Sequence, residues 1–281
     1  MATSIAFHSH KGGSGKTLFA MNFAAYLAKI GKRVAVLDLD LSAPSLGTYF
    51  PGHTGKKINN YLLDQTPPSE VFFDATNIIG ENVDGKLFMA LADDSAEAIA
   101  KINQRDMDAL LNDLFMLMEL VRNVLPEDPF NVDYVIIDTS PGLTTHAING
   151  VAITDHVVLL LRLVNADVEG TKHFLETLYK TVQPRASLII NQIAEHIIAE
   201  GGREKISSLV NSQIINRITA GKVELAGILG TDKQIITNEF NFAMEAMTRV
   251  DKAPRPIHFL NPNSQAFADK FANIAKGLLD V

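Results

Sequence analysis

Residues 8–17 read HSHKGGSGKT and follow directly on the apolar run IAF. The stretch nearly matches the phosphate-binding pattern G-x-x-x-x-G-K-S/T, but His10 stands where the pattern has its first glycine, and a second lysine, Lys11, comes next. In a glycine-rich loop between a strand and a helix, backbone N–H groups converge on phosphate oxygens, and the helix adds its positive N-terminal dipole. The stretch therefore predicts a strand, a phosphate-binding loop and then a helix.

Two side chains at the end of this loop have a defined chemistry toward a nucleotide. We expect Lys16 to reach the β- and γ-phosphates and the hydroxyl of Thr17 to ligate Mg²⁺. A chance glycine turn is disfavoured, because GGSGKT lies between an apolar strand pattern and an amphipathic helix pattern. The residues expected to contact the nucleotide here are Gly12, Gly13, Ser14, Gly15, Lys16, Thr17 and Leu18.

Outward from the loop, apolar runs of strand length alternate with longer helical patterns. The expected strands are SIAF (4–7), RVAVLDLD (33–40), KLFMAL (86–91), DYVIID (133–138), HVVLLLRLV (156–164), ASLIIN (186–191) and VELAGIL (223–229). Strands that alternate with helices indicate right-handed crossovers and a parallel sheet. We therefore expect an α/β fold, a doubly wound, mostly parallel sheet flanked by helices, in a single P-loop domain over residues 1–281.

Three further segments have a recognisable character. The run FAMNFAAYLAKIGK (residues 19–32) has helical spacing, and we expect this helix to begin at Lys16 and to stop near Gly31. Residues 51–84 are rich in Pro, Gly, Asn and Asp, which indicates loops with short helices. Residues 106–125 form a strongly apolar helical pattern before Pro126, and we expect its Met and Phe side chains to pack in the core.

Acidic residues follow two of the expected strands. Asp138 ends an apolar strand in VDYVIIDTSPG, where a carboxylate could hold a water of the Mg²⁺ shell and the TSPG turn could sense the γ-phosphate. Asp38 and Asp40 end the strand in RVAVLDLD, and alternation places both on one face with Leu39 on the other. Open α/β sheets bind ligands at the carboxyl ends of their strands, so these carboxylates are expected beside the loop.

Composition narrows the classes of protein. The chain has 281 residues with 47% hydrophobic and 20% charged residues, and its net charge of −7 disfavours nonspecific binding of nucleic acid by the whole surface. It contains no cysteine, which excludes disulfides, thiolate metal sites and cysteine-ligated clusters. We find neither a secretory leader nor an apolar run of membrane-spanning length, so we expect a cytoplasmic protein.

Four motifs in order resemble those of the deviant Walker A ATPases of the MinD, ParA and Mrp group: KGGSGKT, DLDLSAPSL, VIIDTSPG and LIINQI. The resemblance extends over almost the whole chain. It implies ATP and Mg²⁺ as ligands, a homodimer when ATP is bound, and an activating protein partner. It also implies a catalytic role for Lys11, which would reach across the dimer to the phosphates held by the other subunit.

The same resemblance assigns the remaining site residues. Asp40 would position the attacking water and so join Lys11 and Lys16 as a catalytic residue, and Asp38 and Asp138 would support Mg²⁺. Asn191, at the end of ASLIIN, would read adenine, because a side-chain amide can both donate to and accept from a base edge.

The chain departs from the family pattern at His10 and at Leu18, which replaces a frequent second threonine. We interpret both as tolerated variation and expect the loop histidines to be solvated, with no direct catalytic role for His8 or His10. Arg162, near the end of HVVLLLRLV, is expected to cap its strand as a surface charge rather than to face the nucleotide.

The branches of the family differ in what the dimer binds. The absence of cysteine disfavours Mrp-type scaffolds, nitrogenase iron proteins and tail-anchor or arsenite ATPases, and the tail has no tyrosine cluster of the kind that bacterial tyrosine kinases carry. The tail has balanced polar faces, so we expect its apolar stripe to form the last core helix rather than a membrane anchor. That stripe is Phe267, Phe271, Ile274, Ala275, Leu278 and Leu279. DNA remains an open partner through Arg249, Lys252 and Arg255, although solvated surface charge is the favoured interpretation.

The sequence thus predicts an ATP-dependent dimerising switch that slowly hydrolyses ATP and positions cargo. Two alternatives stay open. The first is a P-loop enzyme of the cobyrinate-amidase or dethiobiotin-synthetase type that uses ATP on a small molecule, and the second is an adaptor that binds ATP without useful hydrolysis.

Overall fold

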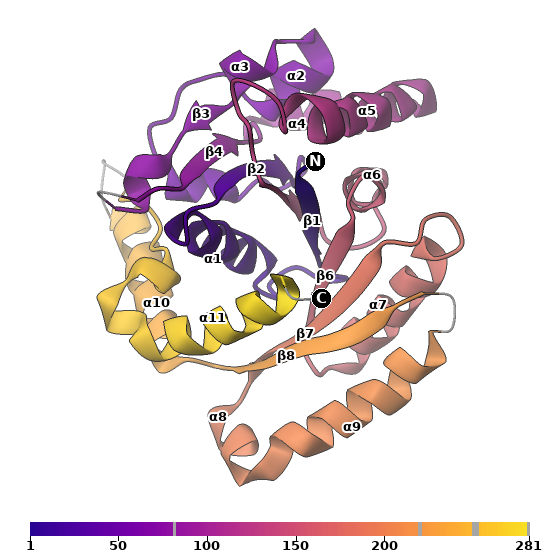
Figure 1. The fold of residues 1–281 in the computed structure, drawn as a ribbon, viewed down its shortest axis with the longest axis vertical. Coiled ribbons are helices and arrows are strands. Elements are labelled where there is room, and N and C mark those ends of the chain that lie inside the picture. Colours follow the sequence, from indigo (N-terminus) through magenta and orange to yellow (C-terminus); the bar gives the residue numbers. More distant parts are fainter. Residues whose placement is uncertain (81–82, 219–220, 249–252, 280–281) are drawn as a thin grey trace.

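The computed structural model of the chain describes residues 1–80, 83–218, 221–248 and 253–279, and Figure 1 shows its helices and strands. The strands are β1 (Thr3–His8), β2 (Arg33–Leu39), β3 (Phe73–Asp74), β4 (Lys86–Ala90), β5 (Tyr134–Thr139), β6 (His156–Leu161), β7 (Arg185–Ile193) and β8 (Val223–Gly230). The α-helices are α1 (Lys16–Lys29), α2 (Ile58–Asp64), α3 (Pro68–Val71), α4 (Ala96–Asn103), α5 (Met107–Glu119), α6 (Thr145–Ala152), α7 (Asn165–Leu178), α8 (Glu195–Ile197), α9 (Arg203–Gln213), α10 (Lys233–Thr248) and α11 (Gln265–Leu279).

The strands form one sheet with the order β3-β4-β2-β5-β1-β6-β7-β8. All neighbouring strands pair in parallel except β3, which pairs antiparallel with β4 at the edge. The predicted doubly wound, mostly parallel sheet is therefore confirmed. Since β1 lies between β5 and β6, the loop that follows it opens near the middle of the sheet, where such folds bind their ligands.

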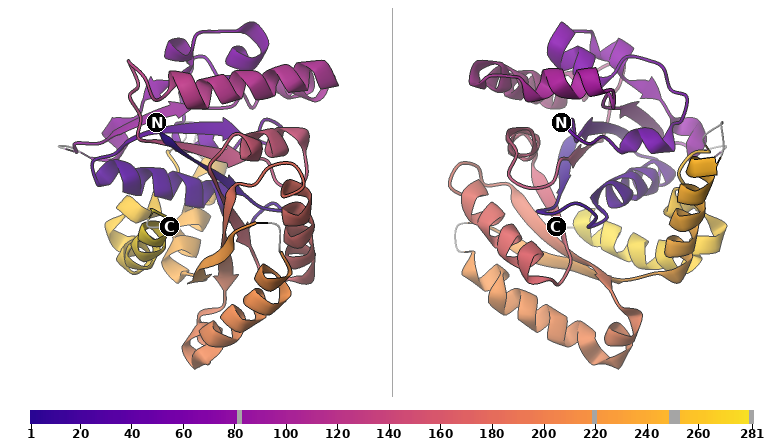
Figure 2. Two further views of the ribbon diagram at one scale, coloured as in Figure 1. Left: turned by 45° about the vertical axis from the view of Figure 1, so that its right-hand side comes forward. Right: turned by 180° about the vertical axis from the view of Figure 1, so that it is seen from behind.

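Helices cover both faces of this sheet (Figures 1 and 2). Successive side chains of a strand point to opposite faces, and β2 shows the consequence. Val34 and Val36 join the core beneath α1 and α11, whereas Ala35 and Leu37 join the core beneath α5, α6, α7 and α9. A strand buried on both faces needs the continuous apolar run that its sequence has.

Most of the expected elements are present where the patterns place them. Helix α1 begins at Lys16 as predicted, and Gly31 adopts a left-handed φ of 89° just beyond its end. Residues 51–84 contain the short helices α2 and α3, but they also contain β3, a two-residue strand that the sequence pattern did not predict.

The helix predicted over residues 106–125 requires a correction. Helix α5 begins after Asp106, whose side chain accepts a hydrogen bond from the N–H of Ala109, and a π-helical turn (η3, Leu120–Val124) continues it. The expected core packing of its Met and Phe side chains is wrong for three of them, because Met107, Phe115 and Met118 are exposed. The core contacts come instead from the leucines and the valine on the other side of the helix, namely Leu117, Leu120, Val121 and Leu125.

The last helix confirms its prediction. Phe267, Phe271, Ala275 and Leu278 of α11 are buried in the core that α1 also lines. The apolar stripe of the tail is thus covered by the protein itself. No helix in the described part of the chain is long and apolar enough to cross a membrane.

Candidate nucleotide-binding site

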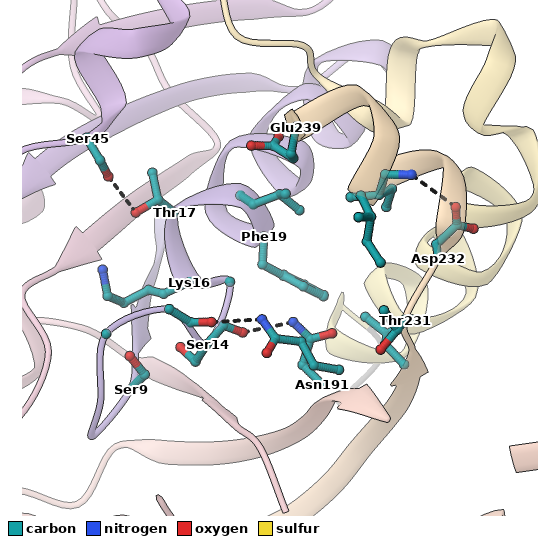
Figure 3. A pocket seen from close by; sticks show the side chains of 18 of the residues that line it. Ser9, Ser14, Lys16, Thr17, Phe19, Ser45, Asn191, Thr231, Asp232 and Glu239 are labelled. Carbon is teal, nitrogen blue, oxygen red and sulfur yellow. Dashed lines mark hydrogen bonds between the residues drawn. The ribbon is translucent and has the colours of Figure 1, made fainter. Parts of the chain in front are cut away.

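The loop after β1 opens into a cavity of about 980 Å³, at the upper end of the size range of small-molecule sites. Figure 3 shows Lys16 and Thr17 at one end of this cavity and Asn191, Thr231 and Asp232 at the other. The predicted residues that line it are Gly12, Gly13, Ser14, Gly15, Lys16, Thr17, Leu18, Asp40 and Asn191. Gly13 and Gly15 have positive φ values of 77° and 93°, which explains why the loop requires glycine there.

Lys16 lies in an acidic cluster. Its Nζ is 3.0 Å from Oδ1 of Asp138 and 3.9 Å from Oδ2 of Asp40, and only 7% of the side chain is exposed. Burial disfavours the charged amine, but the carboxylates of Asp138 and Asp40 outweigh burial and raise the pKa of Lys16. The lysine is therefore a fixed positive charge at the floor of the cavity.

Strand register brings the carboxylates of Asp38 and Asp138 together. Asp38 of β2 is the direct partner of Asp138 of β5, and both side chains are fully buried. Burial, together with the charges of Asp138 and Asp40, raises the pKa of Asp38 well above its ordinary value. Sequence reasoning placed both residues at strand ends, but only the pairing of β2 with β5 makes them neighbours.

The cluster retains unused acceptor capacity. Oδ2 of Asp38, Oδ1 of Asp40 and Oδ2 of Asp138 are buried and have no hydrogen-bond partner among the described residues. Such oxygens fit a hard cation or its bound water. The described residues contain no group of three or more His, Asp or Glu side chains arranged to hold a metal ion.

The surroundings of Asp40 raise the pKa of its carboxyl group. Burial, opposed by Lys16 and reinforced by Asp138, raises its pKa to about 6. Its backbone N–H donates to Oδ1 of Asp38 over 3.1 Å, which fixes the chain just beyond β2. A carboxylate with this pKa is mostly ionised at neutral pH, yet it takes up a proton more readily than an exposed aspartate.

Ser45 is a site residue that sequence reasoning did not assign. Its hydroxyl donates to Oγ1 of Thr17 over 3.0 Å, as Figure 3 shows, and it lines the cavity. The sequence could have indicated this residue, because Ser45 belongs to the motif DLDLSAPSL that carries the family resemblance. The contact joins the loop after β2 to the hydroxyl expected to ligate Mg²⁺.

Asn191 contacts the phosphate-binding loop directly. Its Nδ2 donates to the carbonyl oxygen of Ser14 over 2.8 Å, and a Cβ at Gly15 would lie 2.7 Å from the same nitrogen. Gln192, which adopts a left-handed φ of 62°, donates to the carbonyl oxygen of Gly13 over 2.8 Å. The end of β7 therefore holds the loop, and Asn191 also lines the cavity.

The far wall of the cavity comes from the C-terminal third of the chain, which sequence reasoning missed. It includes Thr231, Asp232, Ile235, Ile236, Glu239, Phe240, Arg255 and Phe267. These residues follow no short motif that points to a nucleotide site, and the sequence patterns gave Arg255 and Phe267 other roles.

Arg255 and Arg162 both occupy ion pairs. Arg255 donates to Glu239, 2.9 Å from its Oε2, and its guanidinium lies 5.2 Å from the ring centre of Tyr49. Arg255 thus lines the cavity. The interpretation of Arg255 as a solvated surface charge, favoured from the sequence, is wrong. The other two members of the expected basic cluster, Arg249 and Lys252, lie outside the described residues. Arg162 follows the end of β6 and pairs with Asp167 over 2.8 Å, in agreement with a cap.

The two loop histidines and Lys11 differ in exposure. His8 is fully buried, stacks on Phe174 and shares a 2.8 Å hydrogen bond with Thr139, so the expectation of a solvated side chain is wrong for it. Burial lowers the pKa of His8 to about 3. His10 is half-buried, whereas Lys11 is exposed and is not among the residues that line the cavity.

Known proteins resemble this chain in sequence and in fold. A family model described as an AAA domain matches residues 2–192. The septum site-determining protein MinD of Bacillus subtilis is 23% identical over 275 residues, which cover 92% of this chain and 88% of that protein.

Two solved structures show the shared fold. MinD of Pyrococcus horikoshii, in complex with Mg-ADP, matches with a TM-score of 0.68 at 16% identity over 99% of this chain and 96% of its own. ParA of pNOB8, bound to nonspecific DNA, matches with a TM-score of 0.64 at 20% identity over 100% of this chain and 98% of its own.

Proposed function

Because the chain belongs to the AAA domain family and to the MinD/ParA type of P-loop ATPases, we propose that it is a cytoplasmic switch that dimerises with bound ATP and releases the dimer by slow hydrolysis. The observation that carries the proposal is the position of Lys16 between Asp138 and Asp40 at the phosphate end of the cavity. We assign residues 1–281 to a single P-loop domain. Cargo, DNA or a protein complex is the object that the switch positions.

The residues of the cavity would divide the binding of ATP among them. The backbone of Gly12, Gly13, Ser14 and Gly15 cradles the phosphates, with Leu18 beside them, and Lys16 exchanges its carboxylate partners for phosphate oxygens. Thr17, Asp38 and Asp138 would hold Mg²⁺, directly or through water, and the buried carboxylate oxygens that have no hydrogen-bond partner among the described residues support this donor set. Bound Mg²⁺ would neutralise part of the negative charge of the phosphates. Asn191 reads the adenine.

Hydrolysis would need a positioned water and a charge from outside the subunit. Asp40 orients the water that attacks the γ-phosphorus, and its raised pKa lets it accept a proton as ADP and phosphate form. Lys11 supplies its positive charge to the phosphates of the other subunit, and its exposure outside its own cavity supports this assignment. A catalytic cation delivered in this way is worth about 10³ to 10⁵ in rate, so a monomer would turn over slowly.

Substitutions at Lys16, Asp40 and Lys11 separate the steps of this cycle. Lys16→Ala should abolish ATP binding in a fluorescent-nucleotide titration. Asp40→Ala should keep binding and accumulate a dimer with ATP and Mg²⁺, measured by light scattering. Lys11→Ala should bind ATP as a monomer.

A strictly monomeric Asp40→Ala protein at saturating ATP would contradict the sandwich mechanism and favour a P-loop enzyme that acts on a small molecule. ADP formation stimulated by one compound of a metabolite panel would support that enzyme. The Asp40→Ala protein with ATP is also the natural bait, because capture of DNA, lipid or protein would identify what the dimer holds.

A further inference from the structure

We propose that His10 is a positioning residue for Lys11. Its ring occupies a notch that Gly170 leaves in α7, and this contact sets the backbone from which Lys11 reaches the partner's phosphates. The inference rests on the proposed role of Lys11 between subunits. The inference assigns a role to His10, the residue that stands where the common phosphate-binding pattern has its first glycine.

The notch exists because residue 170 of α7 has no side chain. Gly170 is buried inside the helix, and a methyl group at this position would overlap the Cγ, Cδ2 and Nε2 atoms of the His10 ring. Glycine is among the least favourable residues in a helix interior, so its presence here needs a steric reason. The close approach of the His10 ring supplies that reason.

The other side of the same loop segment is held by the TSPG turn. The N–H of Gly142 donates to the carbonyl oxygen of Ser9 over 2.9 Å, and a Cβ at Gly142 would lie 3.6 Å from the carbonyl oxygen of His10. The hydroxyl of Ser9 in turn donates to the carbonyl oxygen of Lys11 over 2.9 Å. Ser9, His10 and the backbone of Lys11 are therefore clamped between α7 and the turn after β5.

The contact works through packing. The Nδ1 atom of His10 is buried and has no hydrogen-bond partner among the described residues, and His10 is not among the residues that line the cavity. The ring is thus placed to orient the loop and not to touch the nucleotide. With glycine at position 10 the loop would lose this wedge immediately before Gly12 and Gly13, and Lys11 would be free to sample many orientations.

A double-substitution cycle tests the notch and its effect on Lys11. Four proteins are compared: wild type, His10→Gly, Gly170→Ala and the double variant. In each we measure Tm without nucleotide, ATP affinity, ATP-dependent dimerisation, and kcat and KM for hydrolysis. His10→Gln serves as the conservative variant, and Gly277→Ala in α11 is the matched control, because a methyl group there meets no atom within 4 Å.

We expect the effects of the substitutions at positions 10 and 170 to depend strongly on each other. Gly170→Ala should lower Tm when His10 is present and raise it when residue 10 is glycine, where alanine simply favours the helix. Both single variants should lower kcat by about 10², the usual scale for a misplaced catalytic group, with KM and ATP affinity nearly unchanged. The double variant should be no slower than His10→Gly, and His10→Gln and Gly277→Ala should stay close to wild type.

Each result that differs from this expectation would contradict a different part of the proposal. Additive Tm changes would overturn the contact between His10 and Gly170. Coupled Tm changes with wild-type kcat and dimerisation in both single variants would overturn the positioning role, leaving a contact that serves stability alone. If instead Lys11→Ala dimerises and hydrolyses ATP as wild type does, the proposed function fails at its own step, and the Tm cycle still decides whether the notch exists.

Discussion

Asp40 shows how one side chain acquires a function from its surroundings. It stands just beyond β2 with 6% of its surface exposed, close enough to Lys16 for attraction and to Asp138 for repulsion. Burial is the largest influence, so its pKa rises to about 6 instead of falling as in an ordinary ion pair. The nucleotide-free protein therefore holds a carboxylate whose ionisation opposes folding, a cost typical of functional sites.

This shift predicts a pH-dependent gain in stability for Asp40→Asn without nucleotide. The folded-state pKa of Asp40 lies above the unfolded value of 3.8, so its contribution to stability is present below about pH 4 and is lost as the pH rises through about 6. Asp40→Asn should match wild type near pH 4 and exceed it by up to about 3 kcal/mol at pH 7.

Urea unfolding at pH 4, 5, 6 and 7 measures this difference. His8 is present in both proteins, so the effect of its low pKa, which acts in the opposite direction, cancels in the comparison. A difference that stays constant over this range would show that the Asp40 carboxyl is not perturbed.

Helix α5 shows the limit of periodicity as a guide to burial. Met107, Leu111, Phe115 and Met118 follow one another at helical spacing and share an exposed face, with exposed fractions from 37% to 73%. The helix is apolar nearly all round, so its sequence cannot say which face meets the sheet. Contacts with α6 determine which face of α5 is buried. One of them is the hydrogen bond from the side chain of Asn149 to the carbonyl oxygen of Leu110.

The two faces of α5 should respond differently to truncation. Phe115→Ala removes a ring that is 55% exposed and should change the free energy of unfolding by about 0.5 kcal/mol or less. Leu117→Ala removes a side chain that is 3% exposed and should cost about 2–5 kcal/mol. Urea unfolding of the two variants checks the assignment, and equal costs would mean that the helix is rotated relative to this description.

At the scale of the whole molecule, the cavity joins two distant parts of the chain. The backbone N–H of Arg255 donates to the carbonyl oxygen of Thr48 over 2.9 Å, while Glu239 of α10 pairs with Arg255 and with His258. The loop that carries Ser45 is thereby connected to α10, which forms the far wall of the cavity. Nucleotide bound in the cavity would touch both parts at once.

Glu239→Ala should weaken this connection. It leaves the guanidinium of Arg255 without its carboxylate, and we expect a loss of about 1.5–3 kcal/mol in the free energy of unfolding. Glu97→Ala is the matched control, since Glu97 is exposed and pairs with the exposed Lys101 on the surface of α4. Equal stability of the two variants would show that the Arg255 pair does not hold the wall.

Ligand binding should stabilise the whole fold through the same cavity. A ligand at 100 times its Kd adds about 2.7 kcal/mol to the free energy of unfolding when it binds only the folded state. Mg-ATP should therefore raise Tm in wild type and in Asp40→Ala but not in Lys16→Ala, as measured by differential scanning fluorimetry. A rise in Lys16→Ala would place the nucleotide elsewhere.

The sequence by itself determined the strand–loop–helix unit around Lys16, the parallel sheet and the acidic strand ends, because glycine conformation, strand alternation and helical period are local properties that can be read from neighbouring residues. Tertiary structure decided that Asp38 faces Asp138, that His8 is buried, that Arg255 lines the cavity and that α5 exposes Phe115. Each of these depends on strand register or on packing between segments far apart in the chain, for which the sequence contains no local pattern.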